Sequence, residues 1–280
     1  MAEDTSNQTP ETCSHECGSC SASCGERAGE PSKLEPNAVS KIGKVIGIVS
    51  GKGGVGKTSV TCMVASELAR AGKKVGIMDA DITGPSIPKA FGVKGPLRAD
   101  SNGLNPGVSE CGIKVISTNL LLPQDDMPVA WRGPVISGIL SQFFKEVNWG
   151  ELDYLLIDMP PGTSDTLLTV FQQMPLDGIV TVSAPQELVG MIVGKAVNLA
   201  KEMEVDVLGL VENMAYFECP DCGKQHHIFG EPQGAEVAKK YGIPAYATLP
   251  MDPRLAALVD AGDVYSYDVK GALKPIIDVL

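Results

Sequence analysis

The chain has 280 residues, of which 44% are hydrophobic and 5% aromatic, and it carries a formal net charge of −11. This length suffices for one α/β domain with a substantial core, and the composition suits a sheet rich in Val, Ile, Leu and Ala. The acidic balance argues against nucleic acid as a main partner, because phosphate neutralisation needs a basic face. No stretch approaches a transmembrane span or a secretory signal, so we expect a cytoplasmic protein with no membrane partner.

Residues 1–40 are rich in Ser, Glu, Gly, Pro and Cys and contain almost no large apolar side chains. Such a segment cannot bury a core, so we predict a flexible tail that only a bound metal would order. Four of the eight cysteines lie here, as Cys13, Cys17, Cys20 and Cys24. Thiolates so closely spaced can surround one iron–sulfur cluster or one zinc ion, and they can also remain without a metal.

Residues 41–280 alternate between short apolar runs and helical patterns, which predicts one folded domain. We expect strands at residues 45–50, 74–79, 114–118, 154–158, 178–183, 207–212 and 245–249. We expect helices at residues 58–71, 134–146, 185–203 and 234–241. This alternation indicates an α/β fold with a mostly parallel central sheet, flanked by helices on both faces, and a ligand at the carboxyl ends of the strands.

The first predicted strand leads into Gly51-Lys52-Gly53-Gly54-Val55-Gly56-Lys57-Thr58, followed by Ser59 on a predicted helix. This run fits the phosphate-loop pattern G-x-x-x-x-G-K-[ST] in its strand–loop–helix context. Its glycines let backbone N–H groups turn toward phosphates, and the helix N-terminus adds its positive end. We expect Lys57 to reach the β- and γ-phosphates and the Thr58 hydroxyl to bind Mg²⁺. The motif therefore predicts a nucleoside triphosphate site.

Two acidic segments follow predicted strands and are candidates to complete this site. One strand ends in Asp158 before a turn rich in Pro and Gly, and the strand at residues 74–79 is followed by Asp81. A carboxylate in the first position can hold the Mg²⁺ shell, and one in the second can orient the attacking water or contact the waters bound to the metal. Each Asp alone would also suit a helix cap or a turn. For Lys52, spacing alone leaves two interpretations, a solvated lysine or a charge clamp on the phosphates of a facing subunit.

A second cysteine motif, Cys219-Pro220-Asp221-Cys222, follows the strand predicted at residues 207–212. Two thiolates on a tight turn supply half of a tetrahedral sulfur set, and a two-fold axis would bring in the same pair from a second subunit. A zinc knuckle that includes His226 and His227 is the competing interpretation, and unligated thiols are a third. The isolated Cys62 and Cys111 suit small apolar positions.

These motifs together resemble a known family. The run at residues 52–58 resembles the deviant Walker A motif of the MinD/ParA/nitrogenase-iron-protein class. With the segments 79–86, 158–165 and 219–223, the chain resembles the Mrp/ApbC family of iron–sulfur cluster carrier ATPases over about residues 41–280. The resemblance implies a homodimer that binds ATP, hydrolyses it slowly and hands [4Fe–4S] clusters to apo-proteins.

The resemblance also implies roles for single residues. Lys52 would act across the dimer, Asp81 would lie in switch I, Asp158 would begin switch II and Asn213 would contact adenine. The cysteine-rich tail resembles the ferredoxin-like extension of some family members. Two alternatives stay open, a zinc-binding metallochaperone NTPase and a positioning ATPase of the MinD/ParA type. The positioning ATPase would need a basic amphipathic C-terminal helix or a basic face, and the composition favours neither.

Overall fold

The structure is a computed structural model that describes residues 33–82, 84, 86–122, 133–162, 165–185 and 189–280. The tail cysteines Cys13, Cys17, Cys20 and Cys24 lie outside the described residues. Lys33–Leu280 form one compact unit. The segment before the first strand already belongs to this unit, since the Leu34 amide donates to the Gln173 carbonyl at 2.8 Å.

Every predicted strand and helix has a counterpart in this unit. The strands are β1 (Lys41–Val49), β2 (Val75–Asp79), β3 (Ala99–Asp100), β4 (Gly103–Leu104), β5 (Gly107–Val108), β6 (Lys114–Ile116), β7 (Glu151–Asp158), β8 (Gly178–Ser183), β9 (Val207–Glu218), β10 (Gln225–His226) and β11 (Ala245–Pro250). The helices are α1 (Lys57–Arg70), α2 (Ile87–Ala90), α3 (Gly133–Glu146), α4 (Asp165–Gln173), α5 (Val189–Glu202), α6 (Gly234–Tyr241), α7 (Pro253–Ala261) and α8 (Lys274–Ile277). Within the described residues no helix has both the length and the apolar content to cross a membrane.

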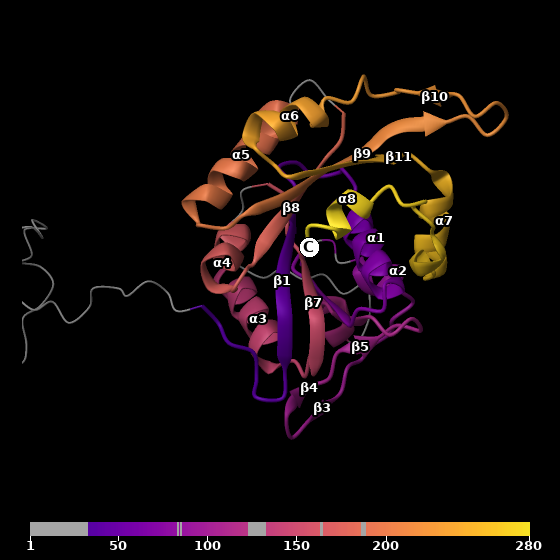
Figure 1. Ribbon diagram of the computed structural model, residues 1–280. Helices are drawn as coiled ribbons and strands as arrows, with labels where there is room; N and C mark the ends of the chain where they lie inside the picture. Colours follow the sequence, from indigo (N-terminus) through magenta and orange to yellow (C-terminus); the bar gives the residue numbers. More distant parts are fainter. Residues whose placement is uncertain (1–32, 83, 85, 123–132, 163–164, 186–188) are drawn as a thin grey trace, which may run out of the picture. The chain divides into compact units, whose positions relative to one another are not determined.

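The main sheet has the strand order β10-β9-β8-β1-β7-β2-β6-β5, and β11 pairs with β9 beside this path. Every pairing in it is parallel except β9 with β10 and β5 with β6. The strand that leads into the phosphate-loop motif, β1, lies in the middle of the sheet (Figure 1). The carboxyl ends of β1, β2 and β7 therefore meet at one edge, where a parallel sheet places its ligand.

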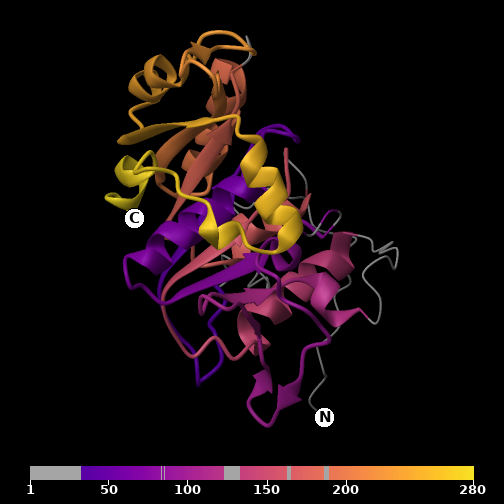
Figure 2. The ribbon, with the colours of Figure 1, turned by 90° about the vertical axis from the view of Figure 1, so that its right-hand side faces the viewer.

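Helices cover both faces of the sheet, which confirms the predicted fold class. Side chains alternate across β1, so that Ile46 and Ile48 enter one core while Val45 and Val49 enter the other. The first core includes residues of α1, α2 and α8, and the second includes residues of α3 and α4. Figures 1 and 2 show these two groups of helices on opposite sides of the central strands. Central strands buried on both faces explain the nearly continuous apolar runs in the sequence.

The strand predicted at residues 207–212 is longer than expected. β9 continues to Glu218 and folds back onto β10, with Gln225 opposite Glu218. Asn213, which the sequence suggested at a strand end, therefore lies inside a strand. Met214, inside β9, has a left-handed φ of 56°, so the strand is irregular at this point.

Candidate functional site

The loop between β1 and α1 has the backbone geometry of a phosphate cradle. Gly54 and Gly56 have φ angles of 80° and 78°, which favour glycine over any other residue. A methyl group on Gly56 would lie 2.3 Å from Asn213 Nδ2, whereas one on Gly54 would meet nothing within 4 Å. Gly56 is the N-cap of α1 and has no side chain to cap the helix, and the first turn contains no acidic residue. The first N–H groups of α1 therefore suit an anion.

Lys57, Thr58 and Asp158 come together at the carboxyl ends of β1 and β7. The Lys57 ammonium forms an ion pair with Asp158, 2.7 Å from Oδ1 to Nζ, and the Thr58 hydroxyl donates to Oδ2 at 2.7 Å. Asp158 is fully buried and Lys57 is 6% exposed. Among the described residues, neither Lys57 Nζ nor Ser50 Oγ has a hydrogen-bond partner, although both atoms are buried. Buried donors of this kind fit a loop that receives phosphate oxygens.

One residue of this cluster, Thr61, was not predicted from the sequence. Its hydroxyl donates to Asp158 Oδ1 at 2.7 Å and to the Lys57 carbonyl at 3.1 Å, and its side chain is fully buried. One signal was available: Thr61 follows Lys57 by four positions, and residues at this spacing share a helix face. The carboxylate of Asp158 thus accepts two hydroxyl bonds in addition to the ion pair with Lys57.

A second buried carboxylate, Asp79, lies beside Asp158, because these residues face each other in the register of β2 and β7. Burial, followed by the charge of Asp158, raises the pKa of Asp79 from 3.8 to about 8. The Ser117 hydroxyl donates to Asp79 Oδ2 at 3.3 Å, and the Asp81 amide donates to Oδ1 at 3.2 Å. Asp81 itself is half-buried just past the end of β2.

The remaining residues predicted for the nucleotide site lie around this cluster. Lys52 is exposed on the loop, and Ser59 is half-buried in the first turn of α1. Asn213 is 3% exposed, and its Nδ2 donates to the Val55 carbonyl at 3.0 Å. The turn after β7 also contacts the loop, since the Gly162 amide donates to the Ser50 carbonyl at 3.0 Å. The turn after β7 and the middle of β9 therefore position the loop.

Cys219 and Cys222 lie on the turn that joins β9 to β10. The Gly223 amide donates to the Cys219 carbonyl at 2.8 Å, and the Cys219 amide donates to the Lys224 carbonyl at 3.0 Å. Cys219 is half-buried and Cys222 is exposed. The backbone amides of Asp221 and Cys222 and the Cys222 thiol hydrogen-bond to Cys219 and lower the pKa of its thiol. A thiolate held this way is suited to bind a metal.

The two histidines that follow this turn have other surroundings. His226 belongs to β10, and His227 Nδ1 lies 2.9 Å from the Ala215 carbonyl. His227 Nε2 also lies 3.5 Å from a carboxylate oxygen of Glu231. In the described part of the chain, no three His, Cys, Asp or Glu side chains gather closely enough to hold a metal ion. The turn as described supplies two thiolates, and the zinc-knuckle interpretation gains no third ligand here.

The isolated cysteines suit the structural roles expected for them. Cys62 is buried in α1, and burial raises the pKa of its thiol well above the usual range. Cys111 is half-buried, with its sulfur 3.1 Å from the Ser109 hydroxyl. Cys111 lies on the turn between β5 and β6, and no second cysteine accompanies it there.

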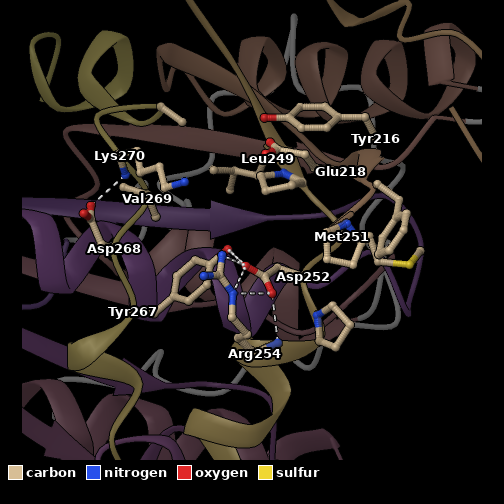
Figure 3. A pocket seen from close by; sticks show the side chains of 15 residues that line it. Tyr216, Glu218, Leu249, Met251, Asp252, Arg254, Tyr267, Asp268, Val269 and Lys270 are labelled. Carbon is tan, nitrogen blue, oxygen red and sulfur yellow. Dashed lines mark hydrogen bonds and ion pairs between the residues drawn. The ribbon is translucent and has the colours of Figure 1, made fainter. Parts of the chain in front are cut away.

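A cavity of about 550 Å³ opens beside the cysteine turn, away from the phosphate loop. Its lining includes Pro220 from the turn and Tyr216 from β9, together with residues of α7 and the C-terminal segment. In Figure 3, Asp252, Arg254 and Tyr267 form one wall, joined by an ion pair and hydrogen bonds. The Arg254 side chain holds the pKa of Asp252 below its usual range. The cavity therefore has a polar wall that is already paired within the chain.

Comparison with known proteins places this geometry in a family. A model of the ParA group described as NUBPL iron-transfer P-loop NTPase matches residues 41–278. An iron–sulfur cluster carrier protein of Clostridium perfringens is 47% identical, over 93% of this chain and 94% of the relative. An iron–sulfur cluster transfer protein NUBPL of Dictyostelium discoideum is 39% identical, over 85% of this chain and 73% of the relative.

Solved structures agree with the fold. A nucleotide-binding protein of Archaeoglobus fulgidus, solved in complex with ADP, is 47% identical and superimposes with a TM-score of 0.74, covering 81% of this chain and 89% of the other. The cell division ATPase MinD of Pyrococcus furiosus is 21% identical with a TM-score of 0.60, covering 85% and 96%, and supports the fold alone. These matches confirm the resemblance drawn from the sequence motifs, and the chain belongs to the NUBPL iron-transfer family of P-loop NTPases.

Proposed function

We propose that this protein is an ATP-dependent carrier that holds a [4Fe–4S] cluster at Cys219 and Cys222 and passes it to apo-proteins. Family membership and the names of relatives at 39–48% identity support this proposal. The observation that carries it is the turn at the end of β9, where one thiol is exposed and the other is half-buried. Such thiols can bind a cluster without being enclosed, so a recipient protein can reach the cargo.

In this proposal residues 51–58 bind ATP, and Asn213 contacts the adenine. Lys57 forms an ion pair with Asp158. Phosphate oxygens of a bound nucleotide would compete with that carboxylate for the ammonium, because both are anions. The oxygens of Thr58 and Asp158 would hold Mg²⁺, which neutralises phosphate charge when bound.

A change in the pairing of Asp158 is the step that would link nucleotide to conformation. Asp158 ends β7, and the turn after it contacts the loop through the Gly162 amide. Release of Lys57 frees the carboxylate to reorient together with this turn, as switch segments do in other nucleotide-dependent proteins. Asp81, beyond the end of β2, would orient the water that attacks the γ-phosphate. Slow ATP hydrolysis then resets the switch.

The cargo site requires a second subunit. One turn supplies two thiolates, half of what a [4Fe–4S] cluster binds, and the same pair from a two-fold related copy completes the set. A homodimer would also bring Lys52, which is exposed, toward the phosphates of the facing subunit. Cys13, Cys17, Cys20 and Cys24 would hold a second cluster in the tail.

The carrier proposal is tested by measuring the iron, sulfide and zinc content of the full-length protein after purification without oxygen. We would compare the wild type with a Cys219→Ser/Cys222→Ser variant, a variant with Ser at all four tail cysteines, and Cys111→Ser as the control. We expect equal amounts of iron and sulfide in the wild type. Each multiple variant should lose the iron and sulfide of one cluster, and the control should lose none. Zinc in place of iron, or iron unaffected by the change at Cys219 and Cys222, would contradict the carrier proposal.

A second measurement tests the role of ATP. Lys57→Ala should load a cluster yet deliver it poorly to an apo-protein that accepts [4Fe–4S]. Delivery is read from the recovered activity of that recipient with and without ATP. Full ATP-independent delivery by this variant would leave the carrier role standing and remove the coupling to nucleotide.

A further inference from the structure

One strand of the sheet touches both the phosphate loop and the cysteine turn. In the middle of β9, Asn213 Nδ2 donates to the Val55 carbonyl of the loop at 3.0 Å. β9 ends at Glu218, and Cys219 is the next residue. Only residues 214–218 therefore separate the contact with the loop from the first thiol.

The strand is irregular where it touches the loop. Met214 has a φ of 56°, which is unusual for a residue other than glycine. The pairing of β9 with β11 also shifts here, because Glu212 lies opposite Thr248 whereas Tyr216 lies opposite Pro250. Residues 213–215 thus form a bulge, and a disfavoured backbone conformation of this kind persists only where surrounding contacts hold it.

Contacts hold the bulge from both sites. On the nucleotide side, a methyl group on Gly56 would lie 2.3 Å from Asn213 Nδ2 and 3.5 Å from Met214 Cε, so both side chains lie close to the loop. On the cysteine side, His227 Nδ1 lies 2.9 Å from the Ala215 carbonyl, and His227 directly follows β10. Successive residues of one short bulge therefore contact the phosphate loop and the returning limb of the hairpin.

We propose that residues 213–215 are the positioning element that transmits the state of the phosphate loop to the Cys219/Cys222 turn. Nucleotide binding changes the backbone at Val55 and Gly56, this changes the contacts that hold Met214 in its left-handed conformation, and the end of β9 reorients with the turn. The biological meaning of this coupling rests on the proposed carrier function. The physical link between the two sites does not depend on the cargo.

The test uses full-length protein freed of metal and kept reduced. The alkylation rates of Cys219 and Cys222 with N-ethylmaleimide are read separately by mass spectrometry, with and without Mg²⁺ and a non-hydrolysable ATP analogue. In the wild type we expect the analogue to change these rates by about 5-fold or more, the usual lower range of coupling between sites. Met214→Gly removes both the contact with Gly56 and the backbone constraint, so the change should fall below about 2-fold while the analogue still binds.

The matched control is Glu204→Gly. Glu204 has nearly the same φ, 55°, and is exposed before β9, away from both sites. It should keep the wild-type response. His227→Leu serves as a second variant because it removes the contact with Ala215 without touching the loop, and it too should reduce the response.

An unchanged response in Met214→Gly, or no response to the analogue in the wild type, would overturn this inference. A response lost equally in Glu204→Gly would also overturn it, because the effect would then not be specific to the bulge. Iron and sulfide content of the same variants, measured after anaerobic purification, decides separately whether the carrier proposal stands. A response that Met214→Gly leaves unchanged, in a protein that retains its cluster, would contradict only the path, whereas a wild type without iron and sulfide would contradict the carrier function.

Discussion

Replacing Lys57 with Ala should destabilise this protein even when no nucleotide is present. The Lys57 ammonium lies 2.7 Å from Asp158 Oδ1, and the two side chains are 6% and 0% exposed. At this separation, Coulomb's law with an effective dielectric constant of about 20 gives roughly 6 kcal/mol for two unit charges. Removing one partner of a buried pair costs about 3–5 kcal/mol, since the other charge remains unpaired. Thr58 and Thr61 still donate to Asp158, so we expect a loss near the lower end, about 3 kcal/mol.

Urea unfolding of the nucleotide-free protein, followed by circular dichroism, measures this loss. A double-mutant cycle with Asp158→Ala should give a coupling energy of about 2 kcal/mol or more, because the two residues share one contact. The matched control is Lys74→Ala, which breaks an ion pair with Glu151 whose side chains are 59% and 67% exposed. Exposed pairs contribute at most about 1 kcal/mol. If Lys57→Ala costs no more than Lys74→Ala, or if the cycle is additive, the reasoning about the buried pair is wrong.

Three further predictions concern the same unit, each measured by urea unfolding without nucleotide. Burial and a neighbouring carboxylate raise the pKa of Asp79 to about 8, so the folded state keeps a proton that the unfolded chain releases above pH 3.8. The free energy of unfolding should therefore fall as the pH rises from 3.8 to about 8, by up to ~1.4 kcal/mol per pH unit. Asp79→Asn should remove this slope, and an equal slope in the variant would contradict the raised pKa of Asp79. Gly56→Ala should cost about 1–3 kcal/mol more than Gly54→Ala, because both have positive φ but only Gly56 lacks room for a methyl group; equal losses would count against the close contact. Tyr246→Phe should cost about 1.5–3 kcal/mol, because the hydroxyl donates at 2.6 Å to the buried carboxylate of Glu212; a neutral effect would show that this bond contributes nothing.

The parts of the fold that could be predicted are those coded by local pattern. Alternating apolar runs and helical periodicity located the central strands, and the glycine spacing located the phosphate loop. The grouping of Lys57, Thr58 and Asp158 also followed from sequence, because the carboxyl ends of parallel strands meet at one edge.

The parts that escaped prediction depend on contacts between distant segments. β9 continues past Glu212 because β10 and β11 pair with it, and neither pairing is visible in the sequence around Met214. Thr61 escaped because its spacing of four from Lys57 places it only on the same helix face, and its bond to Asp158 depends on a distant strand. Likewise, the high pKa of Asp79 comes from burial and from a carboxylate on another strand.

The central place of β1 has a consequence for the synthesis of this protein. Lys41 pairs with Glu151, and Ile46 pairs with Gly178, so β1 must wait for partners that are made much later. At translation rates of about 5–20 residues per second, that wait is roughly 5–20 s for β7 alone. During this time the apolar run that will become the middle of the sheet has no partner strand. The loop after it also lacks its contact with the turn after β7. A nascent chain that ends before β7 should therefore need a chaperone. The phosphate loop can reach its final position only after β7 and β8 have paired with β1.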